Sequence, residues 1–313
     1  MVSFLVRRLV AAIILLIAIT ALSFSLIWSS SGNVARNILG ELATQDQIDA
    51  LNHRLGLDRP LVVQYGDWFR HAIQGDFGVS YFTATPVVDS LATRLPVTLS
   101  LVTVSILIAT VIAVALGITA AVRRGGTDRG IQVFSVVAES LPNFWVGLML
   151  VSTLAIGLGL FPATGYVPID ESLGGWLSTI TLPVTALVIG SIASGAQQIR
   201  SAVIDVLRKD YVRTLRARGL SEGSILFRNV LRNAAPPAVT VISLQFIGML
   251  SGAVLIERVF ALPGMGSLAV NAAILGDIPV IMGVLVVTAV IVVVINLVVD
   301  LAITWINPKA RVQ

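Results

Sequence analysis

Residues 281–304 read IMGVLVVTAVIVVVINLVVDLAIT and contain one charged side chain, Asp300. A helix needs about 20 apolar residues to cross the hydrocarbon core of a bilayer, which is roughly 30 Å thick. This run is therefore long and apolar enough to span a membrane. Five further runs have the same character, at residues 9–29, 97–122, 133–159, 179–198 and 236–256. The sequence predicts an all-α membrane protein with six transmembrane helices.

The composition excludes an ordinary soluble protein. The 313-residue chain is 56% hydrophobic and only 12% charged, with a mean hydropathy of +0.92. An average soluble domain carries about 25% charged residues, so this chain has too few to cover a water-soluble core. The sequence has no cysteine, which excludes disulfides, thiol catalysis and thiolate metal sites. The two histidines, His53 and His71, lack metal-ligand spacing to nearby aspartates, so we expect no metal site.

The basic residues set the expected orientation. With a cytoplasmic N-terminus, 15 of the 21 Lys and Arg residues fall on the cytoplasmic side and six fall outside, which favours two cytoplasmic termini. The first apolar run exceeds the h-region of a signal peptide, about 7–15 residues, so we expect it to be retained. The expected divisions are a first span with its N-terminal flank (1–29), an extracytoplasmic loop domain (30–95), a five-helix core (96–304) and a cytoplasmic tail (305–313).

The extracytoplasmic loop carries helix signals. Thr44 and Gln47 fit a capping box, and the helix that follows should stop at Gly56. Further helix boundaries are expected at Pro60, Gly75 and Pro86. The loop is therefore predicted to form a small folded helical domain.

Residues 199–235 hold eight basic and three acidic residues, and inserting them into a bilayer would cost on the order of 30 kcal/mol. We therefore expect a cytoplasmic loop. Its apolar spacing predicts a helix over 202–217 and a left-handed residue at Gly219. A second short helix capped by Ser221 should end before Pro236–Pro237 and the fifth span. The loop is either a hairpin at the membrane surface or a docking element that passes motion from a soluble partner to the spans.

Polar residues interrupt the apolar runs. Glu139 lies early in the third run, and a carboxylate within a membrane suggests a functional site. It could equally lie among the headgroups or pair with a basic residue of the cytoplasmic loop. Gln197, Gln198, Gln245 and Asn296 either bond across helices or face an aqueous route. The candidates for a translocation path are Glu139, Asn143, Gln197 and Gln245.

Missing motifs exclude several activities. The sequence contains no G-x-x-x-x-G-K-[ST], so we do not expect the chain itself to bind ATP through a P-loop. It contains no H-E-x-x-H, and no catalytic residue is predicted. A secondary transporter that uses Glu139 as a proton or cation carrier remains an alternative, although no internal repeat is evident. An intramembrane hydrolase would need a nucleophile and a base, and no such pair is readable.

Five segments carry a family resemblance. They are LGLDRPLVVQYGDWFRHAIQGDFGVS (55–80), DYVRTLRARGLSEGSILFRNVLRNAAPP (210–237), ERVFALPGMGSLAVNAAILGDIPV (257–280), NLVVDL (296–301) and NPK (307–309). Through them the chain resembles, nearly end to end, the B-type transmembrane subunit of dipeptide/oligopeptide ABC importers, a family that includes nickel and glutathione permeases. The chain departs from the family pattern at Leu215, Asn229 and Asn307-Pro308-Lys309.

The resemblance implies a type I importer permease (MetI-like) core with the extracytoplasmic helical loop domain after the first helix. It implies ATP-driven import, most commonly of di- or oligopeptides, across a bacterial inner or plasma membrane. The implied partners are a C-type permease in a heterodimer, two cytoplasmic ATPase subunits that carry ATP and Mg²⁺, and an extracytoplasmic substrate-binding protein. The chain itself would need no cofactor and would bind lipid but no nucleic acid. The implied ATPase-coupling residues are Tyr211, Arg213, Arg216, Ala217, Arg218, Gly219, Leu220 and Ser221.

Overall fold

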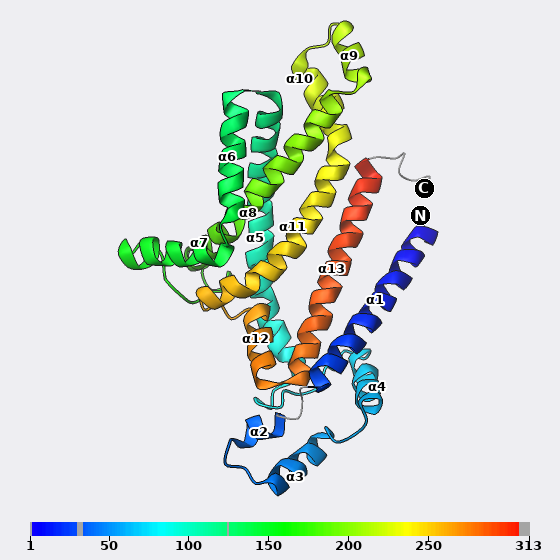
Figure 1. The fold of residues 1–313 in the computed structure, drawn as a ribbon, viewed down its shortest axis with the longest axis vertical. Helices are drawn as coiled ribbons and strands as arrows, with labels where there is room; N and C mark the ends of the chain where they lie inside the picture. The colour runs from blue at the N-terminus through cyan, green and yellow to red at the C-terminus, as the bar shows by residue number, and fades with distance from the viewer. Residues whose placement is uncertain (1, 30–33, 124, 307–313) are drawn as a thin grey trace. The chain divides into compact units, whose positions relative to one another are not determined.

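The computed structural model describes residues 2–29, 34–123 and 125–306, and these are mostly helical (Figure 1). Five helices are long and apolar enough to cross a membrane, and a bent pair of helices would supply a sixth span. The helices of the first half are α1 (Val2–Ser29), α2 (Val34–Leu39), α3 (Gln45–Leu55), α4 (Leu61–Ala72), α5 (Val87–Val122), α6 (Gly126–Ser140), α7 (Asn143–Leu150) and the π-helix η2 (Val151–Gly157). Those of the second half are α8 (Leu173–Leu207), α9 (Asp210–Ala217), α10 (Glu222–Ser224), the π-helix η3 (Ile225–Val230), α11 (Leu231–Val259), α12 (Met265–Leu275) and α13 (Ile278–Ile306).

The chain divides into two compact units. Unit 1 comprises Met1–Val97 with Pro263–Val294, and unit 2 comprises Thr98–Leu262 with Ile295–Gln313. The boundaries fall inside α5 and α13, so each of these helices contributes to both units.

In unit 1, the sequence signals of the α2–α4 segment are confirmed. Thr44 caps α3 in a capping box with Gln47, and Gly56 ends the helix in the left-handed conformation at φ 70°. α4 begins directly after Pro60, and it packs against α1. The helix expected after Pro86 is not separate, because α5 runs from Val87 through Pro96 without a break.

In unit 2, the third predicted span is not one straight helix. α6 and the α7–η2 helix meet at 90°, and α7 runs away from the end of α6 (Figure 1). Leu141 is extended at ψ 121° because it precedes Pro142, and the proline ring disfavours the helical conformation of the residue before it. The bend therefore follows from the sequence Leu141-Pro142.

α8 is the central helix of unit 2 and contacts α6, α7 and α11. It packs closely against α5 at Gly117, where a Cβ atom would lie 2.8 Å from the carbonyl oxygen of Ala196 and 2.9 Å from Ile199 Cβ. Glycine at this position therefore lets the two backbones pack together, as small residues do in membrane helices.

The predicted helix over 202–217 is wrong in its boundaries. α8 continues to Leu207, and α9 starts only at Asp210, after Lys209 adopts an extended conformation. Asp210 lies in the first turn of α9, where a carboxylate is favoured by the helix dipole. The apolar spacing could not reveal this break, because the helical period is similar on both sides of it.

The second predicted loop helix is also not separate from the fifth span. α10, η3 and α11 form one helical stretch from Glu222 to Val259, with Pro236 and Pro237 inside it. Each proline removes the hydrogen bond that its N–H would have made one turn back, and its ring crowds the carbonyl at that position. The helix passes through them, so a double proline did not mark a boundary here.

Candidate functional site

The best-defined candidate site is the arginine corner, which we define as residues 208–224 between α8 and η3. α9 and α10 form its two arms at the ends of α8 and α11 (Figure 1). It contains all eight residues proposed from the coupling motif. The corner turns at Gly219, which has φ 78°.

Gly219 ends α9 in a Schellman motif. The N–H of Gly219 donates to the carbonyl of Arg216 at 2.9 Å, and the N–H of Leu220 donates to the carbonyl of Leu215 at 3.3 Å. A Cβ atom at position 219 would meet no atom within 4 Å, so the requirement for glycine comes from the backbone conformation alone. Ser221 then caps α10 by accepting from the N–H of Ser224. Both boundary predictions at this corner are confirmed.

Buried apolar residues fasten the corner to the long helices. Val212, Ile225 and Val230 are fully buried, and they pack in one cluster with Val206 of α8 and Ala234 of α11. A force on the corner would therefore reach both α8 and α11 through close-packed contacts, because packed interiors are nearly incompressible.

Polar contacts fix the two arms relative to each other. The guanidinium of Arg216 donates to Glu222 through Nε at 2.7 Å and Nη2 at 3.1 Å. Asn233 Nδ2 donates to the hydroxyl of Tyr211 at 3.2 Å. The Arg216–Glu222 pair links α9 to α10 through two hydrogen bonds, although both groups are exposed and the pair adds little stability.

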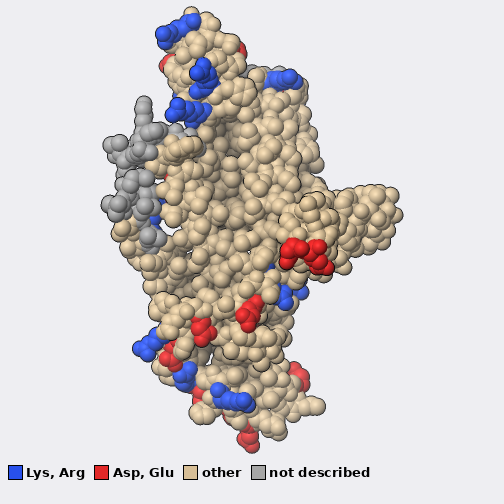
Figure 2. All heavy atoms as spheres, turned by 180° about the vertical axis from the view of Figure 1, so that it is seen from behind, with Lys and Arg blue, Asp and Glu red and all other residues tan. Residues whose placement is uncertain are grey.

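The outer surface of the corner is basic with apolar patches. Arg213 pairs only with Asp210 of its own helix, at 3.4 Å, and Arg218 has no ion pair with any residue that the structure describes. Lys and Arg side chains gather on this tip in Figure 2. Leu220 of the corner is exposed, and Phe227 of the adjoining η3 retains 69% of its accessible surface. The corner therefore offers both charged and apolar groups to a partner.

A second candidate site is a cavity of about 380 Å³ within unit 2. It brings together Glu139, Asn143 and Gln245, three of the four residues proposed for a translocation path. Gln197 does not line this cavity, whereas its neighbour Gln198 does. Gln245 Nε2 donates to the carbonyl of Ser191 at 3.0 Å, so this side chain also joins α11 to α8.

Sequence reasoning missed two polar contacts of unit 2. Asp128, at the start of α6, receives two hydrogen bonds from Arg200 of α8, both at 2.6 Å. Glu257 is fully buried near the end of α11 and accepts from Thr98 Oγ1 at 2.6 Å. In each case the partners lie far apart in the sequence, and no spacing signal connects them.

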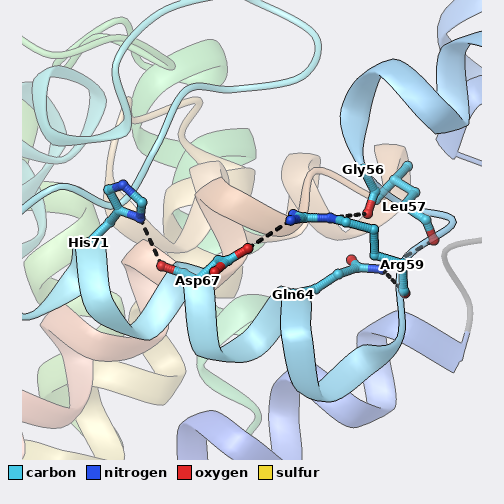
Figure 3. A network of polar contacts seen from close by, with 6 residues as sticks. All are labelled: Gly56, Leu57, Arg59, Gln64, Asp67 and His71. Atoms are coloured by element: carbon cyan, nitrogen blue, oxygen red, sulfur yellow. Dashed lines mark hydrogen bonds and ion pairs between the residues drawn. The ribbon is translucent and has the colours of Figure 1, made fainter.

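In unit 1, the α2–α4 segment is fixed by a polar network (Figure 3). Arg59 Nη1 donates to Asp67 at 2.7 Å, and Gln64 Nε2 donates to the carbonyls of Leu57 and Arg59. His71 Nδ1 lies 2.8 Å from the carbonyl oxygen of Asp67. The amide of Gln64 and the imidazole of His71 thus stabilise the local backbone through its carbonyl groups.

The other histidine of this segment pairs with an acid. His53 Nδ1 lies 2.7 Å from Asp58 Oδ2, and this hydrogen bond lowers the pKa of Asp58. The two histidines therefore contact different aspartates, one through its carboxylate and the other through its backbone.

A buried aspartate joins the segment before α5 to the start of α13. Asp277 accepts from Ser80 Oγ at 2.5 Å and from the N–H of Tyr81 at 3.3 Å. Burial raises the pKa of Asp277 above its ordinary value, against the opposing effect of these hydrogen bonds. Burial, reinforced by the charge of Asp277, raises the pKa of Tyr81 to about 12, so this phenol is a neutral O–H donor near neutral pH.

Comparisons with known proteins agree with these observations. Residues 113–312 match the family described as binding-protein-dependent transport system inner membrane component, and residues 1–102 match its N-terminal family. The chain is 37% identical to the di/tripeptide transport system permease protein DppB of Pseudomonas aeruginosa, with 100% of both chains covered. It is 35% identical to the oligopeptide transport system permease protein AppB of Bacillus subtilis, with 99% of both covered.

A solved structure shares the fold. An inward-facing structure of the MetNI methionine ABC transporter aligns with a TM-score of 0.58 at 18% identity, covering 69% of this chain and 96% of that one. The MetI-like permease fold is therefore confirmed.

Proposed function

Because the chain belongs to the family of binding-protein-dependent transport system inner membrane components, we propose that it is a transmembrane subunit of an ATP-driven importer for di- or oligopeptides. The family membership makes it a multi-pass membrane protein and a permease subunit of an ABC importer. The proposed cargo is supported by relatives of full length that are named as permeases for peptides.

The arginine corner is the proposed point of contact with an ATPase subunit. The observation that carries this proposal is the rigid turn at Gly219, fastened by Val212, Ile225 and Val230 to both α8 and α11. A turn of this kind can enter a groove on a partner and transmit its movement to two long helices. The proposed contact residues are Tyr211, Arg213, Arg216, Ala217, Arg218, Gly219, Leu220 and Ser221.

A permease that switches between two conformations needs an external source of free energy. Driving a two-state equilibrium from 1:99 to 99:1 takes about 5.5 kcal/mol of differential binding. We propose that two ATPase subunits, which hold ATP and Mg²⁺, supply this energy and drive alternating access. A C-type permease subunit would complete the membrane-spanning dimer, and an extracytoplasmic binding protein would deliver the cargo.

The proposed path follows the polar cavity of unit 2. Glu139, Asn143 and Gln245 face one space, and Gln198 replaces Gln197 as a candidate. The 15:6 division of basic residues supports cytoplasmic termini and a cytoplasmic arginine corner. The same orientation makes the α2–α4 segment extracytoplasmic in this proposal.

Uptake into proteoliposomes tests the proposed function. The chain, assembled with its partner subunits and binding protein, is expected to accumulate a labelled dipeptide only when ATP is present on the ATPase side. A secondary transporter that uses Glu139 as carrier is not favoured by the family, and it makes the opposite prediction. Uptake by the chain alone, driven by a proton or sodium gradient without ATP, would overturn the proposal.

A further inference from the structure

Unit 1 contains a cavity that the proposed transport path does not use. It has a volume of about 610 Å³ and lies between the α2–α4 segment, residues 77–84, α1 and the start of α13. Sites for small ligands usually measure about 300–1,000 Å³, so this cavity is large enough for a dipeptide. All of its lining residues belong to unit 1.

One wall of the cavity is aromatic. Phe24, Trp68, Phe77 and Tyr81 line it, and Phe24 and Trp68 pack together with their ring centroids 6.4 Å apart. Such a wall can hold an apolar or aromatic side chain of a ligand, because burying a large apolar side chain is favourable.

The polar wall has an excess of positive charge. Its charged residues are Arg54, Arg59 and Asp67, and Arg59 already pairs with Asp67 at 2.7 Å. Arg54 forms no hydrogen bond or ion pair with the residues that the structure describes, so one guanidinium is left without a counter-charge. A carboxylate is the group that best matches a free guanidinium, through two parallel hydrogen bonds.

A neutral donor stands beside these cations. Tyr81 lines the cavity, its phenol remains protonated near neutral pH, and the charge of Arg59 acts on that phenol. Its O–H can donate a hydrogen bond to a carboxylate. Because the phenol is neutral, it cannot form an ion pair with an ammonium group, as a carboxylate side chain would. Asp277, which could repel an anion, does not line the cavity and has its oxygens engaged by Ser80 and the Tyr81 N–H.

We propose that this cavity binds the free carboxylate end of a short peptide, with Arg54 pairing with the carboxylate and the aromatic wall holding the adjacent side chain. The choice of a peptide rests on the proposed function, whereas the preference for a carboxylate rests on the charges of the cavity. The site lies outside the cavity of Glu139, Asn143 and Gln245, so it is a second binding site on the same chain.

Isothermal titration calorimetry tests the site on the complete transporter in nanodiscs, without binding protein and without ATP. The probes are the dipeptide Leu-Phe and its C-terminal amide. We expect Arg54→Gln and amidation each to weaken binding by about tenfold or more. The matched control is Arg70→Gln, which removes an exposed arginine of α4 that does not line the cavity and should bind both probes as the wild type does.

The outcomes separate the site from the proposed function. If the complex takes up Leu-Phe with ATP and binding protein, but Leu-Phe binding is absent or indifferent to Arg54→Gln and to amidation, the site is overturned and the importer stands. If no peptide is taken up although Arg54-dependent, carboxylate-dependent binding is measured, the site stands and peptide import is overturned. Arg54 is exposed, so Arg54→Gln should not impair folding. The yield of the complex, compared with that of Arg70→Gln, checks this.

Discussion

Position 219 shows how a single backbone conformation can set the geometry of the arginine corner. Only glycine adopts φ 78° without strain, and space is open around the missing side chain. The left-handed conformation costs an L-residue roughly 1–2 kcal/mol, and more for a β-branched side chain. A substitution here changes the shape of the corner without removing any contact.

We therefore expect Gly219→Val to reduce ATP-driven peptide uptake by about 5- to 30-fold or more while the complex still assembles. The control is Gly223→Ala in the same corner, since Gly223 has open space around it and no left-handed backbone. Uptake assays and subunit pull-downs on both variants give the answer. Wild-type uptake by Gly219→Val would show that the turn does not transmit work.

Asp277 gives unit 1 a dependence on pH. Its pKa is raised by burial, so the folded chain keeps a proton at pH values where the unfolded chain has lost it. The stability from this group is complete below the unfolded pKa of about 3.9 and is lost as the pH rises through the raised folded pKa. Asp277→Asn cannot titrate, so the Tm of the variant relative to that of the wild type should increase as the pH rises above about 4.

Asp58→Asn is the control with the opposite sign. The hydrogen bond from His53 lowers the pKa of Asp58, so its contribution to stability is present above the unfolded pKa and is lost as the pH falls. Above the unfolded pKa of about 3.9 the contribution of Asp58 is already complete, so the Tm of Asp58→Asn relative to the wild type should stay level over the range in which that of Asp277→Asn rises. Equal slopes would mean that Asp277 titrates as an ordinary exposed acid.

At the scale of elements, unit 2 depends on close packing around α8. Gly117→Ala would place a methyl group 2.8 Å from the Ala196 carbonyl oxygen, and the helices would have to separate. We expect a loss of about 1–3 kcal/mol in stability, despite the better helix propensity of alanine. Gly130→Ala in α6 is the control, because nothing lies within 4 Å of that position and the Tm should stay level or rise. Equal Tm values for the two variants would contradict this packing.

The ion pair between α6 and α8 makes a separate prediction. Asp128 and Arg200 retain only 14% and 24% of their side-chain exposure, so removing one charge leaves the other poorly compensated. Asp128→Asn should lower stability by about 1–3 kcal/mol, measured by thermal unfolding of the complex. Asp210→Asn, whose side chain is 95% exposed, should change it little. A loss no larger than that of Asp210→Asn would show that the pair is not structural.

Local signals explain which elements could be predicted. The capping box at Thr44, the stop at Gly56 and the turn at Gly219 depend on residues within a few positions of one another, and all three were predictable. The break at Lys209 was not, because amphipathic spacing continues on both sides of it. The contact of Asp128 with Arg200 was invisible because it depends on how α6 packs against α8.

At the scale of the whole molecule, the apolar runs predicted the fold class. The amino-acid composition could not predict where the cavities lie. Glu139, Asn143 and Gln245 were chosen because they are polar within apolar runs, and the structure places them around one cavity. The cavity of unit 1 gave no signal, since its walls come from α1, α3, α4, residues 77–84 and the start of α13. Composition predicts what lies in a membrane, whereas cavities depend on which faces of distant helices meet.

The central claim is that ATPase subunits act on this chain through the arginine corner on the cytoplasmic side. The chain has no cysteine of its own, so Arg218→Cys and Asp170→Cys each introduce a single thiol. Asp170 lies between η2 and α8, in a segment that the proposed orientation makes extracytoplasmic. The measurement is labelling with a membrane-impermeant maleimide, in vesicles of each orientation, with and without the ATPase subunits. We expect the thiol at 218 to react only from the cytoplasmic side and to be protected by the ATPases, and the thiol at 170 to react only from the opposite side. Labelling of position 218 from outside, or no protection by the ATPases, would contradict the claim.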